Sequence, residues 1–124
     1  MYQLLIEQAE SVLGEFQLAR SDLTAGAVGC ALSTATGQVY TGICLDLACG
    51  IGFCAEHAAI AEMLKARETV IDSIVAVSAK GILMPCGRCR ELMVQVGSAN
   101  LNTKVVVDRM NHIRLSELLP RHWM

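Results

Sequence analysis

The sequence lacks runs of basic residues, long apolar segments and an N-terminal leader pattern. Its formal net charge is -2, whereas a polynucleotide-binding protein normally carries a basic patch, so we expect a small-molecule partner. No stretch approaches the about 18 uninterrupted apolar residues of a membrane span. Glu7 and Glu10 interrupt the N-terminal region, which therefore has no signal-type apolar core. We accordingly expect a cytoplasmic protein with no nucleic-acid and no membrane partner.

Internal repeats, linkers and low-complexity segments are also missing. At 124 residues the chain is long enough for a hydrophobic core, and we expect one domain spanning 1–124. Hydrophobic residues make up 53% of the chain and the mean hydropathy is +0.44, which is high for a small soluble monomer. This composition indicates that some apolar surface is buried between the subunits of an oligomer.

Three of the six cysteines form the most informative pattern. One cluster is the tripeptide C-A-E that begins at Cys54, and the other is the pentapeptide P-C-G-R-C that contains Cys86 and Cys89. Together they can supply three thiolates to Zn²⁺ and leave the fourth tetrahedral position open, as in catalytic zinc sites. A zinc ion in that state activates water near neutral pH. Glu56, two residues after Cys54, is predicted to move protons as a general acid and base.

Two other interpretations fit part of this pattern. A lone C-x-x-C motif is often a redox pair or half of a structural zinc site. A structural site needs a fourth cysteine or histidine ligand, and the sequence offers Cys30, Cys44, Cys49 and His57. Neither interpretation requires the glutamate of C-A-E, so we favour catalytic zinc. Cys30 lies in an apolar run and is interpreted as a core residue.

Hydrophobic periodicity predicts alternating helices and strands. Apolar residues three or four apart, from Leu5 to Phe16, indicate an N-terminal helix. Cys54 and Cys86 fall in the first turns of two further predicted helices, where the partial positive charge favours a thiolate. The predicted helices are 2–19, 54–67, 86–96 and 116–119, and the predicted strands are 27–34, 38–44, 74–78, 104–108 and 112–115. This order predicts a three-layer α/β/α sandwich around a mixed five-stranded sheet.

The motifs C-A-E at 54–56 and P-C-G-R-C-R at 85–90 resemble those of the zinc-dependent cytidine deaminase family. The flanking residues from Gly81 to Arg90, with E-L-L-P at 117–120, are most similar to its blasticidin S deaminase branch. The resemblance covers roughly residues 20–120 and implies the same fold. It also implies a zinc-dependent hydrolase that converts cytidine or deoxycytidine to uridine or deoxyuridine plus ammonia, with no organic cofactor.

The resemblance also reveals departures that affect the substrate. Family members carry Asn-x-Glu after the second strand to hold the ribose hydroxyls, and the matching residues here are Cys44 and Asp46. A family aromatic residue that packs on the base is matched by Gly26. Cys44, Asp46 and Ala55 are therefore the candidate substrate contacts. A modified nucleoside such as blasticidin S is an alternative substrate, and a non-catalytic zinc-binding or redox module is a second alternative function.

Three thiolates on Zn²⁺ leave a net negative charge, which opposes Lewis acidity. Arg88, Arg90 and His57 are the candidates to balance it, and family members often carry Arg where His57 stands. The resemblance further implies a homotetramer in which each pocket lies at a subunit interface. Trp123 is then either a cover for its own or a neighbour's pocket, or a terminal aromatic residue without such a role.

Overall fold

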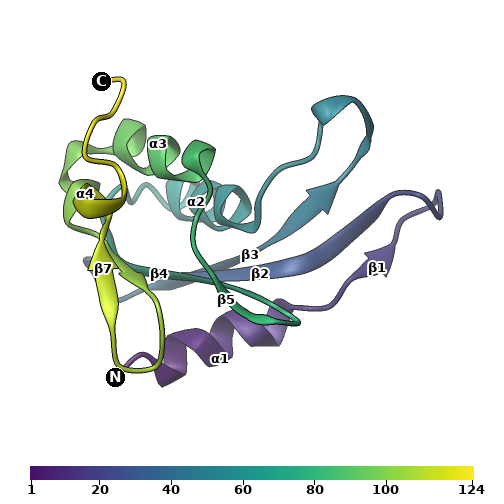
Figure 1. Ribbon diagram of the computed structural model, residues 1–124, viewed down its shortest axis with the longest axis horizontal. Coiled ribbons are helices and arrows are strands. Elements are labelled where there is room, and N and C mark those ends of the chain that lie inside the picture. The colour runs from purple at the N-terminus through teal and green to yellow at the C-terminus, as the bar shows by residue number, and fades with distance from the viewer.

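A computed structural model describes all 124 residues, which form a layered α/β structure (Figure 1). The helices are α1 (Gln3–Val12), α2 (Ala55–Lys65), α3 (Gly87–Val96) and α4 (Leu115–Leu118), with two 3₁₀ helices, η1 (Ala48–Gly50) and η2 (Ser98–Asn102). The strands are β1 (Phe16–Gln17), β2 (Thr24–Thr34), β3 (Val39–Asp46), β4 (Ile71–Ser78), β5 (Gly81–Leu83), β6 (Lys104–Val106) and β7 (His112–Arg114).

The five predicted strands form the body of the sheet, in the order β3-β2-β4-β6-β7. The β4–β6 pair is parallel and the other pairs are antiparallel, which confirms the prediction of a mixed sheet. The predicted number of five strands is wrong, because the sheet has seven. The additional strands are β1, which pairs with the start of β2, and β5, which pairs with the end of β4. Two or three residues are too few to show a hydrophobic period.

Helices cover both faces of this sheet, as the three-layer prediction requires (Figure 1). Helix α1 packs on one face, and α2 and α3 lie on the other. Two hydrophobic clusters fill the two interfaces. Buried side chains that anchor the helices are Leu5, Ile6 and Ala9 from α1, Ala59, Ile60 and Met63 from α2, and Met93 and Val94 from α3.

The helix predicted over 2–19 ends at Val12, so the prediction is wrong for the C-terminal part of that range. Leu13 has extended backbone, and the Gly14 N–H donates to the Gly26 carbonyl at 2.9 Å. Phe16, which the periodicity places on the apolar face of that helix, instead lies in β1 and is 52% exposed. Pairing of β1 with β2, as in Phe16 with Ala25, overrides the local helical period.

Gly42 allows α2 to approach the sheet closely. A Cβ atom at this position would lie 2.4 Å from the Ala59 backbone N and 2.7 Å from the Ala55 carbonyl O. Ala55 is the first residue of α2, so the start of this helix can lie directly against β3 only because Gly42 has no side chain. Small residues at this contact therefore position one of the two helices that carry the predicted zinc ligands.

None of these helices has the length and apolar character needed to cross a membrane. Helix α2 has 11 residues and α3 has 10, whereas a spanning helix needs about 20 apolar residues.

Candidate active site

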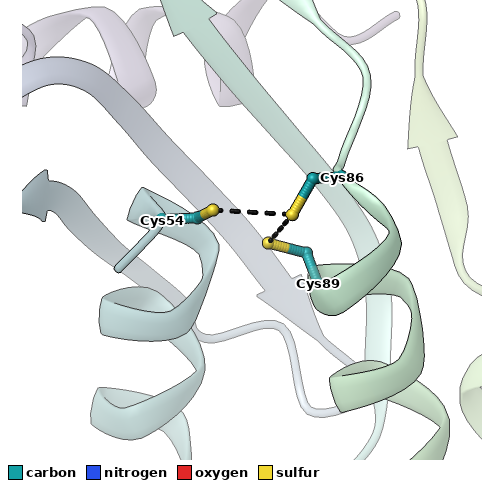
Figure 2. A group of neighbouring side chains, drawn as sticks. All are labelled: Cys54, Cys86 and Cys89. Carbon is teal, nitrogen blue, oxygen red and sulfur yellow. Dashed lines mark hydrogen bonds between the residues drawn. The ribbon is translucent and has the colours of Figure 1, made fainter. Parts of the chain in front are cut away.

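The three predicted zinc ligands lie where two helices begin, and their sulfur atoms point toward one another (Figure 2). Cys54 is the N-cap residue of α2 and Cys86 is the N-cap residue of α3, so each stands just before its helix rather than in the first turn. Cys89 lies in the first turn of α3. The Cys54 thiol contacts Cys86, and the Cys86 thiol contacts both Cys54 and Cys89, so both N-cap thiols are directed to the cluster. The positive ends of two helix dipoles therefore face the same three sulfurs.

The spacing of the sulfur atoms fits a tetrahedral zinc ion. The Sγ atoms of Cys54 and Cys86 are 3.5 Å apart, and those of Cys86 and Cys89 are 3.4 Å apart. All three sulfurs lie within 4.8 Å of one another. Zinc–sulfur bonds of about 2.3 Å in tetrahedral geometry place two sulfurs roughly 3.8 Å apart. Only three candidate ligands gather here, so the donor set would leave one position of a tetrahedral metal open.

The three candidates for charge balance occupy different places. The Nδ1 atom of His57 lies 3.5 Å from the Cys89 sulfur, within hydrogen-bonding range of a ligand. Arg90 donates instead to the carbonyls of Pro85 and Leu118. The side chain of Arg88 is exposed at the cavity described below. Among the three, His57 is therefore the one in contact with a ligand sulfur.

Without metal, the pKa values of the three cysteine thiols are shifted in different directions. Burial raises the pKa of Cys89 far above its ordinary value, and the nearby Glu56 raises it further. Burial also raises the pKa of Cys54. At Cys86 burial acts in the same direction, but hydrogen bonds from the Cys89 N–H and from neighbouring thiols outweigh it, so its pKa lies below the ordinary value. A metal that binds all three sulfurs must displace protons, so binding is coupled to proton release.

Glu56 lies in the first turn of α2 and is only 5% exposed. Burial raises the pKa of its carboxyl group above the ordinary value for glutamate. Its carboxylate is not part of the three-residue metal cluster, although the side chain lines the same cavity as Cys54 and Cys86. A buried carboxyl group with a raised pKa beside an open metal position is suited to proton transfer.

A cavity of about 510 Å³ opens beside the cysteines. This volume lies within the usual range for small-molecule sites, and most of the lining is apolar. All three candidate substrate contacts, Cys44, Asp46 and Ala55, line it together with Glu56. The apolar part of the wall comes mainly from Ala27, Val28, Leu45, Leu47, Phe53, Ala76, Leu83 and Met84.

Cys44 and Asp46 present few free hydrogen-bonding groups to this cavity. The sulfur of Cys44 is buried and accepts a hydrogen bond from the Val28 N–H at 3.3 Å. Its thiol lies 3.8 Å from a carboxylate oxygen of Asp46. Apart from Glu56, Asp46 is the only carboxylate in the lining. Asp46 is thus the stronger of the two candidates for holding a substrate hydroxyl group.

The position matched to the family aromatic residue cannot carry any side chain. Gly26 has φ of +88°, and a Cβ atom there would lie 2.3 Å from the Gly14 carbonyl O. The aromatic residue of the cavity is instead Phe53, which the sequence reasoning missed. Its backbone forms two hydrogen bonds with Leu45, at 3.0 and 3.1 Å, which fix the loop before α2 to the end of β3. The sequence signal that could have identified Phe53 as a cavity residue is its position directly before Cys54.

The remaining cysteines and Trp123 lie outside the sulfur cluster. Cys30 is fully buried in the core, as predicted, and Cys49 is exposed on η1. The side chain of Trp123 is 84% exposed and does not line the cavity, so it does not cover the pocket of its own subunit. Its backbone N–H donates to Glu91 at 2.8 Å.

Residues 4–105 match the family model described as the cytidine and deoxycytidylate deaminase zinc-binding region. The chain belongs to this deaminase family. The matched zinc-binding region contains Cys54, Cys86 and Cys89, the residues that the structure brings into one cluster. Zinc is therefore the metal of this site, in agreement with the chemistry of its three-sulfur donor set.

Individual members of the deaminase family are similar over most of the chain. A cytidine deaminase from Mycobacterium tuberculosis is 31% identical over 96 residues, which cover 76% of this chain and 70% of the relative. The crystal structure of a glutamate-to-glutamine mutant of that organism's cytidine deaminase has a TM-score of 0.82 at 25% identity, covering 100% of this chain and 98% of that chain. Cytidine deaminase from Burkholderia pseudomallei has a TM-score of 0.79 at 27% identity, with 99% of both chains covered. These similarities confirm the predicted fold.

Proposed function

We propose that this protein is a zinc-dependent cytidine deaminase, which hydrolyses cytidine or deoxycytidine to uridine or deoxyuridine and ammonia. The observation that carries the proposal is the convergence of Cys54, Cys86, Cys89 and Glu56 beside one cavity. Family membership supports the reaction class, and the similar proteins named above are cytidine deaminases. The cavity can enclose a nucleoside, and its apolar wall suits a pyrimidine ring.

Each residue of the site has a chemical role in this proposal. Zinc, when held by the three thiolates, supplies Lewis acidity and an activated water molecule. Glu56 accepts one proton at its carboxylate from the attacking water and donates it to the ring nitrogen. It then accepts the second proton, from the hydroxyl group formed on the ring carbon, and donates it to the leaving amine, which departs as ammonia. Burial of Glu56 keeps bulk water away from this carboxylate and raises its pKa above the ordinary glutamate value. His57 is proposed to donate from Nδ1 to the Cys89 sulfur and offset part of the thiolate charge.

The proposed substrate contacts follow from the cavity lining. Asp46 accepts a hydrogen bond from a sugar hydroxyl, while Ala55, at the start of α2, borders the base near Glu56. Cys44 supplies a mainly apolar surface, because its sulfur already accepts the Val28 N–H. Phe53 adds an aromatic side chain to the same wall.

A modified nucleoside such as blasticidin S is the second candidate substrate. It is favoured by the replacement of the family's ribose-binding amide with Cys44, and by flanking residues that resemble the blasticidin S deaminase branch. The cytidine deaminases described above support cytidine as the first substrate to test.

The subunits are proposed to assemble as a homotetramer. The number four comes from the family resemblance, while the structure supplies apolar surface for an interface. Ile51 is 69% exposed beside the loop that borders the cavity, and Leu83 and Met84 are each 39% exposed at the cavity itself. Covering these side chains with a neighbouring subunit would remove apolar surface from water.

Ammonia release from the purified zinc-loaded protein tests the reaction. We expect release from cytidine or deoxycytidine, with Glu56→Gln as the inactive control. Cytosine, blasticidin S and other amino-azines complete the panel, and activity on blasticidin S alone would select the second candidate. A protein that holds one zinc per chain and releases no ammonia from any of these compounds would instead be the non-catalytic zinc-binding or redox module.

A further inference from the structure

Arg90 connects the zinc-ligand segment to the C-terminal part of the chain. It follows Cys89 directly and lies in the first half of α3. Its Nε donates to the Pro85 carbonyl at 2.8 Å, and its Nη1 donates to the Leu118 carbonyl at 2.8 Å. The backbone N–H of Arg90 also donates to the Cys86 carbonyl at 3.0 Å. One residue therefore holds the two successive carbonyls at 85 and 86 and ties them to α4.

The bond to Pro85 bears directly on the orientation of Cys86. The Pro85 carbonyl and the Cys86 N–H belong to one planar peptide group, so fixing the carbonyl fixes the plane from which the Cys86 side chain projects. Pro85 is buried and has no N–H with which to anchor itself. Within α3 the Cys86 sulfur contacts the Cys89 sulfur at 3.4 Å, and the preceding peptide supplies a second restraint on its direction.

The far end of the guanidinium group is held by α4. Leu118 is the last residue of that helix, and the final carbonyls of a helix lack partners within it. Arg90 forms no ion pair with a carboxylate, and both of its hydrogen bonds end on backbone oxygens. The next residue, Glu91, accepts the N–H of Trp123, so a second bond from α3 holds the same C-terminal segment, which runs beside α3 in Figure 1.

We propose that Arg90 is a positioning residue for the zinc ligand Cys86, acting through the Pro85 carbonyl and held in place by Leu118 of α4. Loss of its guanidinium group frees the peptide before Cys86 and makes zinc leave the site more easily. A lysine cannot reproduce the effect, because its single ammonium group lacks the rigid fork that spans two carbonyls. This inference rests on the zinc site of the proposed function.

The test measures how fast zinc passes from each holoprotein to excess chromophoric chelator, at a temperature below the melting temperature of every variant. We expect Arg90→Ala to release zinc on the order of 10–100-fold faster than wild type, the usual scale for groups that orient metal ligands. Arg90→Lys keeps the charge and the apolar stem, and we expect an acceleration between those of wild type and Arg90→Ala.

Arg114→Ala is the matched control, because Arg114 also donates to a backbone carbonyl, that of Asn102, at 2.8 Å. We expect this variant to melt at a lower temperature and to release zinc at the wild-type rate. Cobalt(II) in place of zinc gives a second readout, and its visible absorption should shift in the Arg90 variants and stay unchanged in Arg114→Ala.

Two results would overturn the inference. One is a wild-type rate of zinc release in Arg90→Lys and, where it folds, in Arg90→Ala. The other is an equal acceleration in Arg114→Ala, which would show that the effect follows general stability. Cys86→Ala, measured in parallel, separates this outcome from failure of the zinc site itself, because full zinc retention in that variant would reject Cys86 as a ligand.

Discussion

Glu56 is the side chain on which the proposed reaction depends most directly. It is buried, lies two residues after a zinc ligand and borders the cavity without joining the metal cluster. Replacement by glutamine keeps its size and hydrogen-bonding capacity but removes the basic carboxylate. We expect Glu56→Gln to retain zinc and the fold while turnover falls by about 10²–10⁴, the usual contribution of a general acid and base.

Measuring zinc content, melting temperature and ammonia release on one Glu56→Gln preparation separates this role from a structural one. A glutamate that only interacts with the helix dipole contributes about 0.3–1 kcal/mol to stability. In that case turnover would be near normal and the melting temperature slightly lower, which would reject the catalytic assignment.

Cysteine substitutions test the metal ligands residue by residue. Cys86→Ala removes one of three sulfurs, so we expect zinc content to fall to near zero in the purified protein. The melting temperature should fall as well, because the metal joins the start of α2 to the start of α3. Cys30→Ala is the control, since Cys30 is fully buried in the core, and it should keep one zinc per chain.

Among the structural elements, the contact between α2 and β3 determines where Cys54 stands. A methyl group on Gly42 would lie 2.4 Å from the Ala59 backbone nitrogen. This clash is with backbone atoms, so a change of side-chain rotamer cannot relieve it. We expect Gly42→Ala to lower the free energy of unfolding by roughly 1–3 kcal/mol, as overpacked cores do. Zinc affinity should fall in parallel, because α2 must move together with its N-cap cysteine.

Gly97→Ala provides the comparison for this prediction. A Cβ atom on Gly97 has its nearest neighbour at 3.6 Å, an ordinary van der Waals distance. Chemical denaturation of the two variants, followed by zinc titration, should show a loss only in Gly42→Ala. Equal stability of Gly42→Ala and wild type would contradict the proposed close contact.

A hydrogen-bonded carboxylate links the turn between β2 and β3 to the segment after α2. Glu68 accepts hydrogen bonds from the hydroxyl groups of Thr36 at 2.5 Å and Tyr40 at 2.8 Å. The bond from Thr36 is the largest of the effects that lower the pKa of Glu68. Because the folded pKa lies below the unfolded value, ionised Glu68 contributes stability above the ordinary glutamate pKa of about 4.3. That contribution is lost as the pH falls through the folded pKa.

We therefore expect Glu68→Gln to melt below wild type at pH 7, with a difference that shrinks as the pH is lowered toward about 3. Melting curves across this range provide the measurement. Glu10→Gln is the control, because Glu10 is an exposed glutamate without a side-chain hydrogen bond. A difference for Glu68→Gln that grows toward acidic pH would have the wrong sign for this explanation.

For the whole molecule, the proposed homotetramer is tested by its mass in solution. Light scattering during size-exclusion chromatography at micromolar concentration should give four times the mass of the 13.3 kDa chain. Charged substitution of an exposed apolar residue, such as Ile51→Glu, should shift the mass downward if that face is an interface. A monomer for the wild-type protein at this concentration would reject the assembly.

The sequence predicts the main helices and strands and the two cysteine motifs well because each is a pattern within a short window. The spacing of Cys86 and Cys89 and their neighbouring residues are visible in one turn of helix. The early end of α1 and the hydrogen bonds from Arg90 to Pro85 and Leu118 cannot be predicted from such patterns. Phe16 pairs with Ala25 across a turn, and Arg90 contacts Leu118 much farther along the chain. Local periodicity carries no information about those pairings.

The placement of the zinc ligands also affects the unfolded chain. Cys54 and Cys86 are 32 positions apart, and the segment between them contains α2, β4 and β5. A metal that stays bound to both residues closes this segment into a ring, as a disulfide would. Closing a loop of that length restricts the unfolded chain by about 3–4 kcal/mol in the chain-entropy description. Because β4 and β5 both lie inside this segment, the ring would keep the central strand of the sheet close to α2 and to its partner β5 before β2 and β6 pair with it.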